Sequence, residues 1–441
     1  MRAALGLLAV ILAALSAGCS KTTSVMTGQG ATGPSSPSLL GSATTPKNGA
    51  PANPAPTSPG PLPGSGSAKA GTGANPKQTS TPQQLGFSYL GTKNTTRVAG
   101  ADPISDAAAV ALAVDPSTAP GTHPGAVALA PSDDWQASIA ASSLMGTPFR
   151  APLLLSTPGK LPTATASALN LLAPTGEAAT DKAQVLQIGD TPQPKGYKTT
   201  GIGSSDPYFT AAQVDAYEAR LRGNKESKNV VIASGEQAPW AMPAAGFAAE
   251  SGEPVLFTKS NSVPAATAAQ LAKHKPAHIY VLGPQKVISN NVTKALSAYG
   301  TVKRISAPSP EALSVALTLY RDPPCPANNN ACAHIPGSFG WAIRTPGHGY
   351  TFINESQPLT APASAALSAS GSYGPQLLLT APNTLPKPVL NFLINYSTPG
   401  YSNEGPTAAV YNHGWLIGDV GQISEAVQAQ IDSLLEVVPT K

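Results

Sequence analysis

A short pattern recurs three times along this chain and constrains its fold more than any other feature of the sequence. Each copy has three apolar residues in a row, a polar turn, an apolar residue followed by proline, and an apolar residue seven places after that proline. The apolar runs begin at Leu153, Val255 and Leu377. Because the run and the proline are equally spaced in all three copies, we infer an internal repeat rather than a chance match.

The segments around each copy predict alternating strands and helices. Short apolar runs that suit buried parallel strands precede the copies at residues 125–130, 229–233 and 350–354. Ala-rich segments that suit closely packed helices begin at Trp135, Trp240 and Ala361, and further apolar runs end at Gly189, Gly283 and Gly418. Strand, helix, strand, proline-initiated helix and strand is the order of a doubly wound parallel α/β unit, with proline at the first helical position. Residues 85–441 are too many for one ordinary core, so we expect three repeats, at 85–205, 206–320 and 321–441.

The first 18 residues predict a signal peptide. Arg2 precedes an apolar run from Ala3 to Leu15 that is too short to span a bilayer comfortably, and small residues follow the run. The sequence from Leu15 to Cys19 resembles a bacterial lipobox, although Ser16 stands where leucine is usual. We expect cleavage before Cys19 and attachment of diacylglycerol to its thiol, so that two acyl chains hold the protein to the membrane. An ordinary secretory signal that ends near a cysteine is the alternative.

Residues 19–84 consist mainly of Pro, Gly, Ser, Thr and Ala without periodic apolar positions. Such a segment buries too little apolar surface to offset its conformational entropy, so we expect a disordered tether. Before residue 85 the chain has five basic and no acidic residues, out of 27 Lys plus Arg and 23 Asp plus Glu, which leaves 22 against 23 for residues 85–441. The folded region is therefore nearly neutral, and its composition gives no support for a nucleic-acid partner.

Two further cysteines, Cys325 and Cys332, lie in a loop rich in Pro and Asn. In an exported protein, two cysteines that close a short loop indicate a disulfide, and two free thiols are the alternative. A metal site is a weaker interpretation because no CxxC pair accompanies them.

Three features of residues 95–438 carry a family resemblance. The first is the sequence Arg97-Val98-Ala99-Gly100-Ala101-Asp102 ahead of an Ala-rich segment, with a weaker echo from Arg304 to Pro308. The second is the leucine run with its later Leu-Pro, and the third is the strand that ends in Ile-Gly or Leu-Gly. Together they resemble the cell wall binding repeat type 2 family of Gram-positive surface proteins. The chain departs from the family's pattern at Asp134-Trp135-Gln136 and at Gly189-Asp190, which leaves the identity of the ligand open.

The resemblance implies an α/β fold of three Rossmann-like parallel-sheet repeats around a pseudo-threefold axis. It also implies non-covalent attachment to an anionic cell-wall polymer, which takes clustered Lys and Arg. Open α/β sheets bind ligands at the ends of their strands. The basic residues near such ends or in the lead-in segments are our binding candidates, namely Arg97, Arg150, Lys160, Lys259 and Arg304. Solvated surface charge is the alternative for each of them.

The sequence offers no motif of an enzyme. No dinucleotide fingerprint, Walker loop or nucleophile elbow follows a predicted strand. His274 and His278 are four residues apart, but Pro276 between them disfavours a shared helical face. Trp135 and Trp240 hold equivalent positions, where packing between repeats is favoured over stacking on a sugar. We therefore expect no catalytic residue, no metal and no cofactor.

These observations predict a non-catalytic lipoprotein on the extracellular side of the cell membrane, facing the wall and binding a wall polymer through its repeats. One alternative is the solute-binding lipoprotein of a transporter, which would show two lobes and a hinge instead of three matching copies. The other is a cell-wall hydrolase or an amidase-associated component, which would need a metal or acidic constellation.

Overall fold

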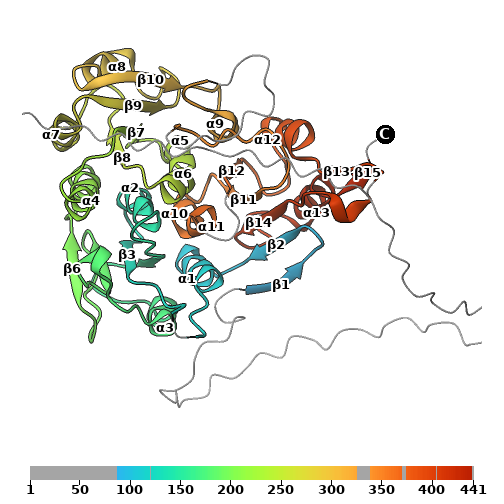
Figure 1. Cartoon of the computed structure of the whole chain (residues 1–441), viewed down its shortest axis with the longest axis horizontal. Coiled ribbons are helices and arrows are strands. Elements are labelled where there is room, and N and C mark those ends of the chain that lie inside the picture. Colours follow the sequence, from blue (N-terminus) through green and yellow to red (C-terminus); the bar gives the residue numbers. More distant parts are fainter. Residues whose placement is uncertain (1–86, 120, 325–337, 370–373, 404, 440–441) are drawn as a thin grey trace, which may run out of the picture. The chain divides into compact units, whose positions relative to one another are not determined.

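The computed structural model describes residues 87–119, 121–324, 338–369, 374–403 and 405–439 (Figure 1). All of them fall within one of the two contact units of the chain, Gly73–Lys441. Cys19, Cys325 and Cys332, together with the predicted signal peptide and tether, lie outside the described residues, so lipidation and the disulfide stay predictions. No helix in the described ranges has the length and apolar character that crossing a membrane requires.

Three sheets share one strand order. Counted from the strand that follows each linker helix, the first strand lies between the second and the third, and a fourth strand lies beyond the third. Sheet 1 comprises β3 (Val127–Pro131), β4 (Leu153–Ser156), β5 (Val185–Ile188) and β6 (Thr199–Ile202). Sheet 2 comprises β7 (Asn229–Ser234), β8 (Val255–Thr258), β9 (Ala277–Leu282) and β10 (Gly300–Ile305). Sheet 3 comprises β11 (Gly349–Asn354), β12 (Gln376–Leu379), β14 (His413–Ile417) and β2 (Thr95–Val98), with β1 (Phe87–Gly91) antiparallel beyond β2. The shared parallel order confirms the predicted α/β fold of three repeats and argues against a two-lobed solute-binding protein.

The fourth strand of sheet 3 comes from the opposite end of the chain. The N-terminal strand β2, blue in Figure 1, lies parallel beside the C-terminal strand β14, red, with Arg97 opposite Leu416. Arg304 stands opposite Val281 in the same way between β10 and β9. The predicted division at residue 205 places β2 in the first repeat, whereas its backbone hydrogen bonds belong to the third sheet. Each lead-in strand therefore completes the preceding sheet, and the first of them completes the last sheet.

A linker helix leaves the fourth strand of each sheet and packs on the next sheet. These helices are α1 (Pro103–Val114), α4 (Pro207–Leu221) and α9 (Pro310–Leu319). Each contacts the second strand of the following sheet and the helix after that strand, which is α3 (Thr163–Leu172), α7 (Ala265–Lys273) or α12 (Lys387–Phe392). Because α1 leads from sheet 3 to sheet 1, the contacts are cyclic, as a pseudo-threefold arrangement requires.

The repeated proline lies one position earlier than predicted. Pro162, Pro264 and Pro386 are the N-caps of α3, α7 and α12, with extended ψ angles of 152°, 150° and 141°. Proline at the first helical position occurs instead in the linker helices, at Pro103, Pro207 and Pro310. Both positions precede the first N–H group that has an intrahelical partner, so a residue without an N–H fits either.

Small residues allow the central helices of the three repeats to approach closely. These are α2 (Trp135–Ala141), η1 (Ser142–Met145), α6 (Pro243–Ser251), α10 (Thr360–Ser364) and α11 (Ala366–Ala369). A Cβ atom at Gly246 would lie 2.7 Å from Oγ of Ser368, so a larger residue there would push α6 away from α11. All of the alanines of these helices except Ala369 are almost completely buried, and the three repeats consequently share one apolar core.

The remaining elements are short. They are η2 (Ala178–Thr180), α5 (Ala238–Ala241), α8 (Asn290–Leu296), η3 (Leu393–Ser397), β13 (Gly400–Tyr401), η4 (Pro406–Ala408), α13 (Glu425–Leu434) and β15 (Val438–Pro439). The helices α8 and α13 follow the third strands of sheets 2 and 3, as the sequence predicts, and Oγ of Ser424 caps α13 by accepting from the Val427 N–H.

Candidate functional site

Two adjoining cavities form a groove that begins at the carboxyl ends of the strands of sheet 1. The first, of about 470 Å³, is lined by residues that follow β3, β4, β5 and β6. The second, of about 640 Å³, shares Ser205 and Pro207 with the first and extends to Lys259 and Ser262 beyond β8. Together they are termed the edge groove. It lies where β3 has β4 on one side and β5 on the other, the position at which open α/β sheets bind ligands.

Two carboxylates of the edge groove are committed to helix capping. Asp134 accepts a hydrogen bond of 2.9 Å from the Ala137 N–H at the start of α2. Asp206 accepts from the Tyr208 and Phe209 N–H groups at the start of α4. These bonds satisfy N–H groups that have no partner within their helices, and each carboxylate also lies at the positive end of the helix dipole. Asp134 and Asp206 therefore shape the groove floor by fixing where the two helices begin.

Two further carboxylates of the groove do not cap a helix. Asp133 follows β3, Asp190 follows β5, and both are exposed. Neither forms a hydrogen bond or an ion pair within the described part of the chain. A carboxylate accepts hydrogen bonds from hydroxyl or amine groups of a ligand. The first cavity thus presents two available acceptors beside the hydroxyl-bearing Ser204 and Ser205.

The two halves of the groove are held together by contacts between repeats. Nε2 of Gln136 donates to the carbonyl oxygen of Gly235 at 3.1 Å, which ties α2 to the end of β7. A Cβ atom on Gly235 would lie 2.7 Å from the ring of Tyr208, so glycine is needed for this close approach. The Trp135 ring meets Phe257 of β8 edge to face, at 6.0 Å and 89°. These contacts fix the relative position of the two cavities.

The two tryptophans at equivalent repeat positions differ in their surroundings. Trp135 packs between repeats, as predicted, through its contact with Phe257. Trp240 is 6% exposed and lies beside Gly283 of its own repeat, with Nζ of Lys286 5.6 Å from its ring centroid.

Arg97, the first of the predicted polymer-binding residues, is enclosed in sheet 3 with 0% of its surface exposed. Its Nη1 donates to the carbonyl oxygens of Gly418 and Asp419, each at 3.0 Å, and its Nε donates to Oε1 of Gln428 at 3.0 Å. Burial lowers the pKa of the Arg97 guanidinium, and Asp419 opposes that shift. The side chain therefore joins β2 to β14 and α13, and it offers no surface to a polymer.

Arg304 holds the equivalent position in sheet 2 but is only half-buried. Its Nη1 donates to the carbonyl oxygen of Gly283 at 2.8 Å, as that of Arg97 does to Gly418. In sheet 1 the equivalent position is Gly201, opposite Gln187, so the third copy of this clamp is absent. The arginine of the lead-in pattern is thus primarily a strand clamp.

The three other predicted residues are exposed but do not lie together. Lys160 and Lys259 stand in the corresponding turns after β4 and β8, and Lys259 lines the second cavity of the edge groove. Arg150 precedes β4 and lines a separate cavity of about 440 Å³ with Asp115 and Glu177, at the amino ends of the strands. Lys160 and Lys259 therefore remain candidates for ligand binding at the edge groove, and Arg150 belongs to the opposite edge.

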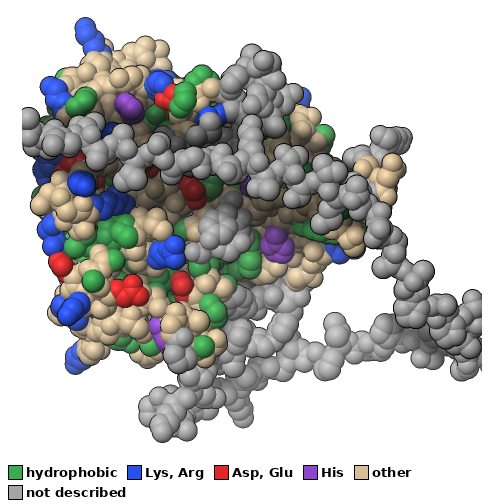
Figure 2. Space-filling model, viewed as in Figure 1, with side chains coloured by type: hydrophobic (Ala, Val, Ile, Leu, Met, Phe, Trp, Pro, Cys, Tyr) green, Lys and Arg blue, Asp and Glu red, His purple; other side chains and the backbone are tan. Residues whose placement is uncertain are grey.

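Charge in this region is mixed. Figure 2 shows Lys and Arg side chains interspersed with Asp and Glu over the visible described surface, without one continuous basic patch. At the edge groove itself, Asp133 and Asp190 line the first cavity and Lys259 lines the second, and the two cavities share Ser205 and Pro207. Such a groove can accept hydrogen bonds from hydroxyl groups and offer one or two ammonium groups to an anion.

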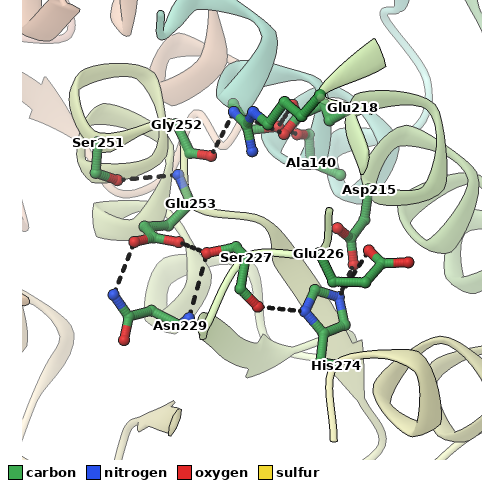
Figure 3. Close-up of polar contacts among 12 residues, drawn as sticks. Ala140, Asp215, Glu218, Glu226, Ser227, Asn229, Ser251, Gly252, Glu253 and His274 are labelled. Atoms are coloured by element: carbon green, nitrogen blue, oxygen red, sulfur yellow. Dashed lines mark hydrogen bonds and ion pairs between the residues drawn. The ribbon is translucent and has the colours of Figure 1, made fainter. Parts of the chain in front are cut away.

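A second polar cluster was not foreseen from the sequence. Asp215, Glu226 and His274 come together between α4 and α7 (Figure 3), at the opposite end of sheet 2 from the edge groove. Asp215 and His274 are separated by 59 residues. His274 and His278 share no helical face, as Pro276 between them indicates, because His274 ends α7 and His278 lies in β9. Only the packing of α4 on α7 reveals the cluster.

Comparison with known proteins gives one family match and several similar proteins. Residues 202–293 match the family described as Cell wall binding domain 2 (CWB2). The chain is 32% identical over 123 residues to the "Amidase enhancer" of Bacillus subtilis (strain 168), which covers 27% of this chain and 17% of that protein. Among solved structures, Cwp6 from Clostridium difficile has a TM-score of 0.58 at 16% identity, covering 78% of this chain and 48% of that one. Cwp8 from the same organism has a TM-score of 0.56 at 15% identity, covering 78% and 53%.

This chain spans about half of the two structural neighbours and less of the amidase enhancer. At these identities the structural likeness establishes a shared fold. The match at residues 202–293 begins at the end of β6 and runs through α4 and the first three strands of sheet 2. It therefore covers a linker helix and most of one repeat.

Proposed function

Residues 202–293 match the cell wall binding domain 2 family, which the repeat pattern also resembles, and from this premise we propose that the protein binds the bacterial cell wall through the edge groove. One observation carries the proposal. Every residue that lines the second cavity of the groove, from Ser205 to Ala266, lies inside the matched region. The role is that of a non-catalytic binding protein attached to the wall by non-covalent contacts.

The ligand that suits this groove is a wall glycopolymer. Asp133 and Asp190 are placed to accept hydrogen bonds from sugar hydroxyl groups, and Ser204 and Ser205 can both donate and accept. Lys259, and Lys160 in the turn beside the first cavity, would meet the phosphate or carboxylate groups of an anionic polymer. We infer recognition of an anionic glycopolymer by a few specific contacts, since the groove is not uniformly basic.

Co-sedimentation of the purified protein with isolated cell walls, across a series of salt concentrations, tests this function. Replacing both Asp133 and Asp190 with alanine should weaken binding on the order of tenfold for each charge-assisted hydrogen bond lost. Replacing both Lys160 and Lys259 with alanine should weaken binding and flatten its salt dependence by about one unit of slope per lost phosphate contact. The matched control is Arg150→Ala, which removes an exposed cation from the opposite edge and should leave binding unchanged.

Two results would contradict the proposal. Absence of co-sedimentation at low salt would contradict the proposal that the protein binds the wall. Equal losses in Arg150→Ala and in the groove variants would show that the wall is held elsewhere or by overall charge alone.

We further propose that a lipid on Cys19 anchors the protein to the outer side of the membrane, with residues 19–84 as a tether that lets the repeats reach the wall. The lipobox-like sequence supports this proposal. Partition of the full-length protein into a detergent phase should be lost when Cys19 is replaced by alanine. Retention of the Cys19→Ala protein in the detergent phase would contradict lipid anchoring through this residue.

The similarity to the amidase enhancer supports a second candidate function, in which the wall-bound protein stimulates a cell-wall amidase. Release of soluble wall fragments by a purified amidase, with and without this protein, tests it. An unchanged rate at saturating protein would exclude the accessory role and leave wall attachment in place.

A further inference from the structure

The cluster introduced in Figure 3 joins two repeats at the amino end of sheet 2. Asp215 lies on α4, the linker helix that arrives from sheet 1, and Glu226 lies in the loop between α4 and β7. His274 is the C-cap residue of α7, which packs on α4. One nitrogen and two carboxylate oxygens of these residues lie within 4.8 Å of one another.

Both ring nitrogens of His274 face acceptors. Its Nδ1 lies 2.7 Å from the carbonyl oxygen of Ser227, and its Nε2 lies 2.6 Å from Oδ2 of Asp215. The carbonyl oxygen can only accept, so Nδ1 carries a proton and Nε2 points at the two carboxylates. A histidine whose Nδ1–H is held by a backbone carbonyl, with Nε2 turned to acidic groups, has the orientation of a metal ligand.

An ion pair between Asp215 and His274 does not explain the position of the Glu226 carboxylate. Its Oε2 is buried and has no hydrogen-bond partner in the described part of the chain, although it lies 3.7 Å from Nε2 of His274. A buried carboxylate oxygen without a partner is costly unless something compensates its charge. Its side chain is 22% exposed, so solvent and ions can reach the cluster from this side.

The surroundings are rich in carboxyl groups. Glu218 and Glu253 lie near the cluster, as Figure 3 shows, and each interacts electrostatically with one of its members. The cations that interact with these carboxyl groups are Arg222 and Lys273. A divalent cation between Asp215 and Glu226 would place two positive charges beside the two ligand carboxylates, whereas a protonated histidine places one.

We propose that Asp215, Glu226 and His274 form a binding site for a divalent transition-metal ion of the zinc type. Two ligand atoms on one tetrahedral zinc ion are about 3.3 Å apart, given bonds of about 2.0–2.1 Å. The distances of 2.6 Å and 3.7 Å from Nε2 to the two carboxylates lie on either side of that value, so small side-chain movements suffice. Three protein ligands leave a fourth position for water on the exposed side of Glu226.

The groups around the ligands suit this assignment. Nε2 of Gln270 donates to Oδ2 of Asp215 at 3.1 Å, and the Ser227 carbonyl holds the His274 ring, so two of the three ligands are already oriented. The bound ion would connect α4 to α7 and thereby fasten the linker helix from sheet 1 to the second repeat. The site is separate from the edge groove, so the proposal of metal binding does not depend on the proposal of wall binding.

Calorimetric titration of the purified, chelator-treated protein with Zn²⁺ tests the site. The cysteines are first alkylated, since free thiolates also bind zinc. We expect one ion per chain, at least tenfold weaker binding in Glu226→Gln, and loss of binding in His274→Ala. His278→Ala is the matched control, because it removes an exposed histidine four residues away and should bind Zn²⁺ like the unaltered protein.

Two further measurements separate binding from folding. Glu226→Gln replaces a carboxylate oxygen that accepts no hydrogen bond, so in chelator its melting temperature should stay close to that of the unaltered protein. Only the unaltered protein should gain stability on adding Zn²⁺. Co²⁺ bound at the site should show tetrahedral absorption without a thiolate charge-transfer band. Absence of Zn²⁺ binding, or equal affinity in the unaltered protein and both variants, would show that the cluster is an ion pair alone.

Discussion

Replacing Arg97 with alanine should destabilise the protein far more than replacing Arg304, although the two residues occupy the same register in sheets 3 and 2. Arg97→Ala removes three hydrogen bonds of 3.0 Å and leaves three acceptors, on Gly418, Asp419 and Gln428, without this donor. Each buried acceptor left unsatisfied costs about 1–3 kcal/mol, so the loss of all three bonds, after partial relaxation, should cost about 3–5 kcal/mol. Arg304→Ala removes a single bond, to the Gly283 carbonyl, from a half-buried site and should cost about 1 kcal/mol.

Urea-induced unfolding followed by circular dichroism measures both free energies of unfolding. The expected difference between the variants is about 2–4 kcal/mol, which follows from the burial of Arg97 and the number of its bonds. Variants that lose equal stability, or an Arg97→Ala protein as stable as the original, would refute the view that this arginine clamps β2 to the end of the chain. Arg97→Met fills a similar volume without charge and should recover part of the loss.

Two other predictions follow from buried groups. Burial raises the pKa of Glu218 to about 8, despite a bond of 2.5 Å from Oγ of Ser143 and the nearby Arg222. The folded state thus holds the proton of the Glu218 carboxyl more tightly than the unfolded state does. The free energy of unfolding should therefore fall as pH rises from about 4.5 to about 8. Urea-induced unfolding measured in chelator at several pH values should show a smaller fall in Glu218→Gln. Trp135→Ala removes the contact with Phe257 between repeats and should lower stability by about 2–4 kcal/mol in thermal unfolding, whereas an unchanged melting temperature would contradict a packing role.

The repeat and its alternation of strands and helices could be predicted because they rest on local patterns. Apolar runs such as Leu153 to Leu155 are fully buried strands, and the glycine that ends each third strand, such as Gly189 with φ of 58°, adopts a conformation that glycine favours. The proline after each run was misplaced by one residue, because N-cap and first helical position suit proline almost equally and the sequence does not distinguish them.

The site was harder to foresee. Three of the predicted residues share one sequence feature, a basic side chain near a predicted strand end. In the structure Arg97 is enclosed in sheet 3, Lys160 stands beside the edge groove, and Arg150 lies at the opposite edge of sheet 1. An expected anionic ligand predicts basic residues at its site, so it does not predict Asp133 and Asp190, which line the groove.

The sequence by itself determined the number of repeats, the α/β class and the alternation of strands and helices within each repeat, since each depends on residues a few positions apart. Tertiary structure alone decided the rest. Nε of Arg97 meets Gln428 across 331 residues of chain, and Asp215 meets His274 across 59. Burial and pairing of a charged group depend on whichever distant segment packs against it, and no local pattern records that packing.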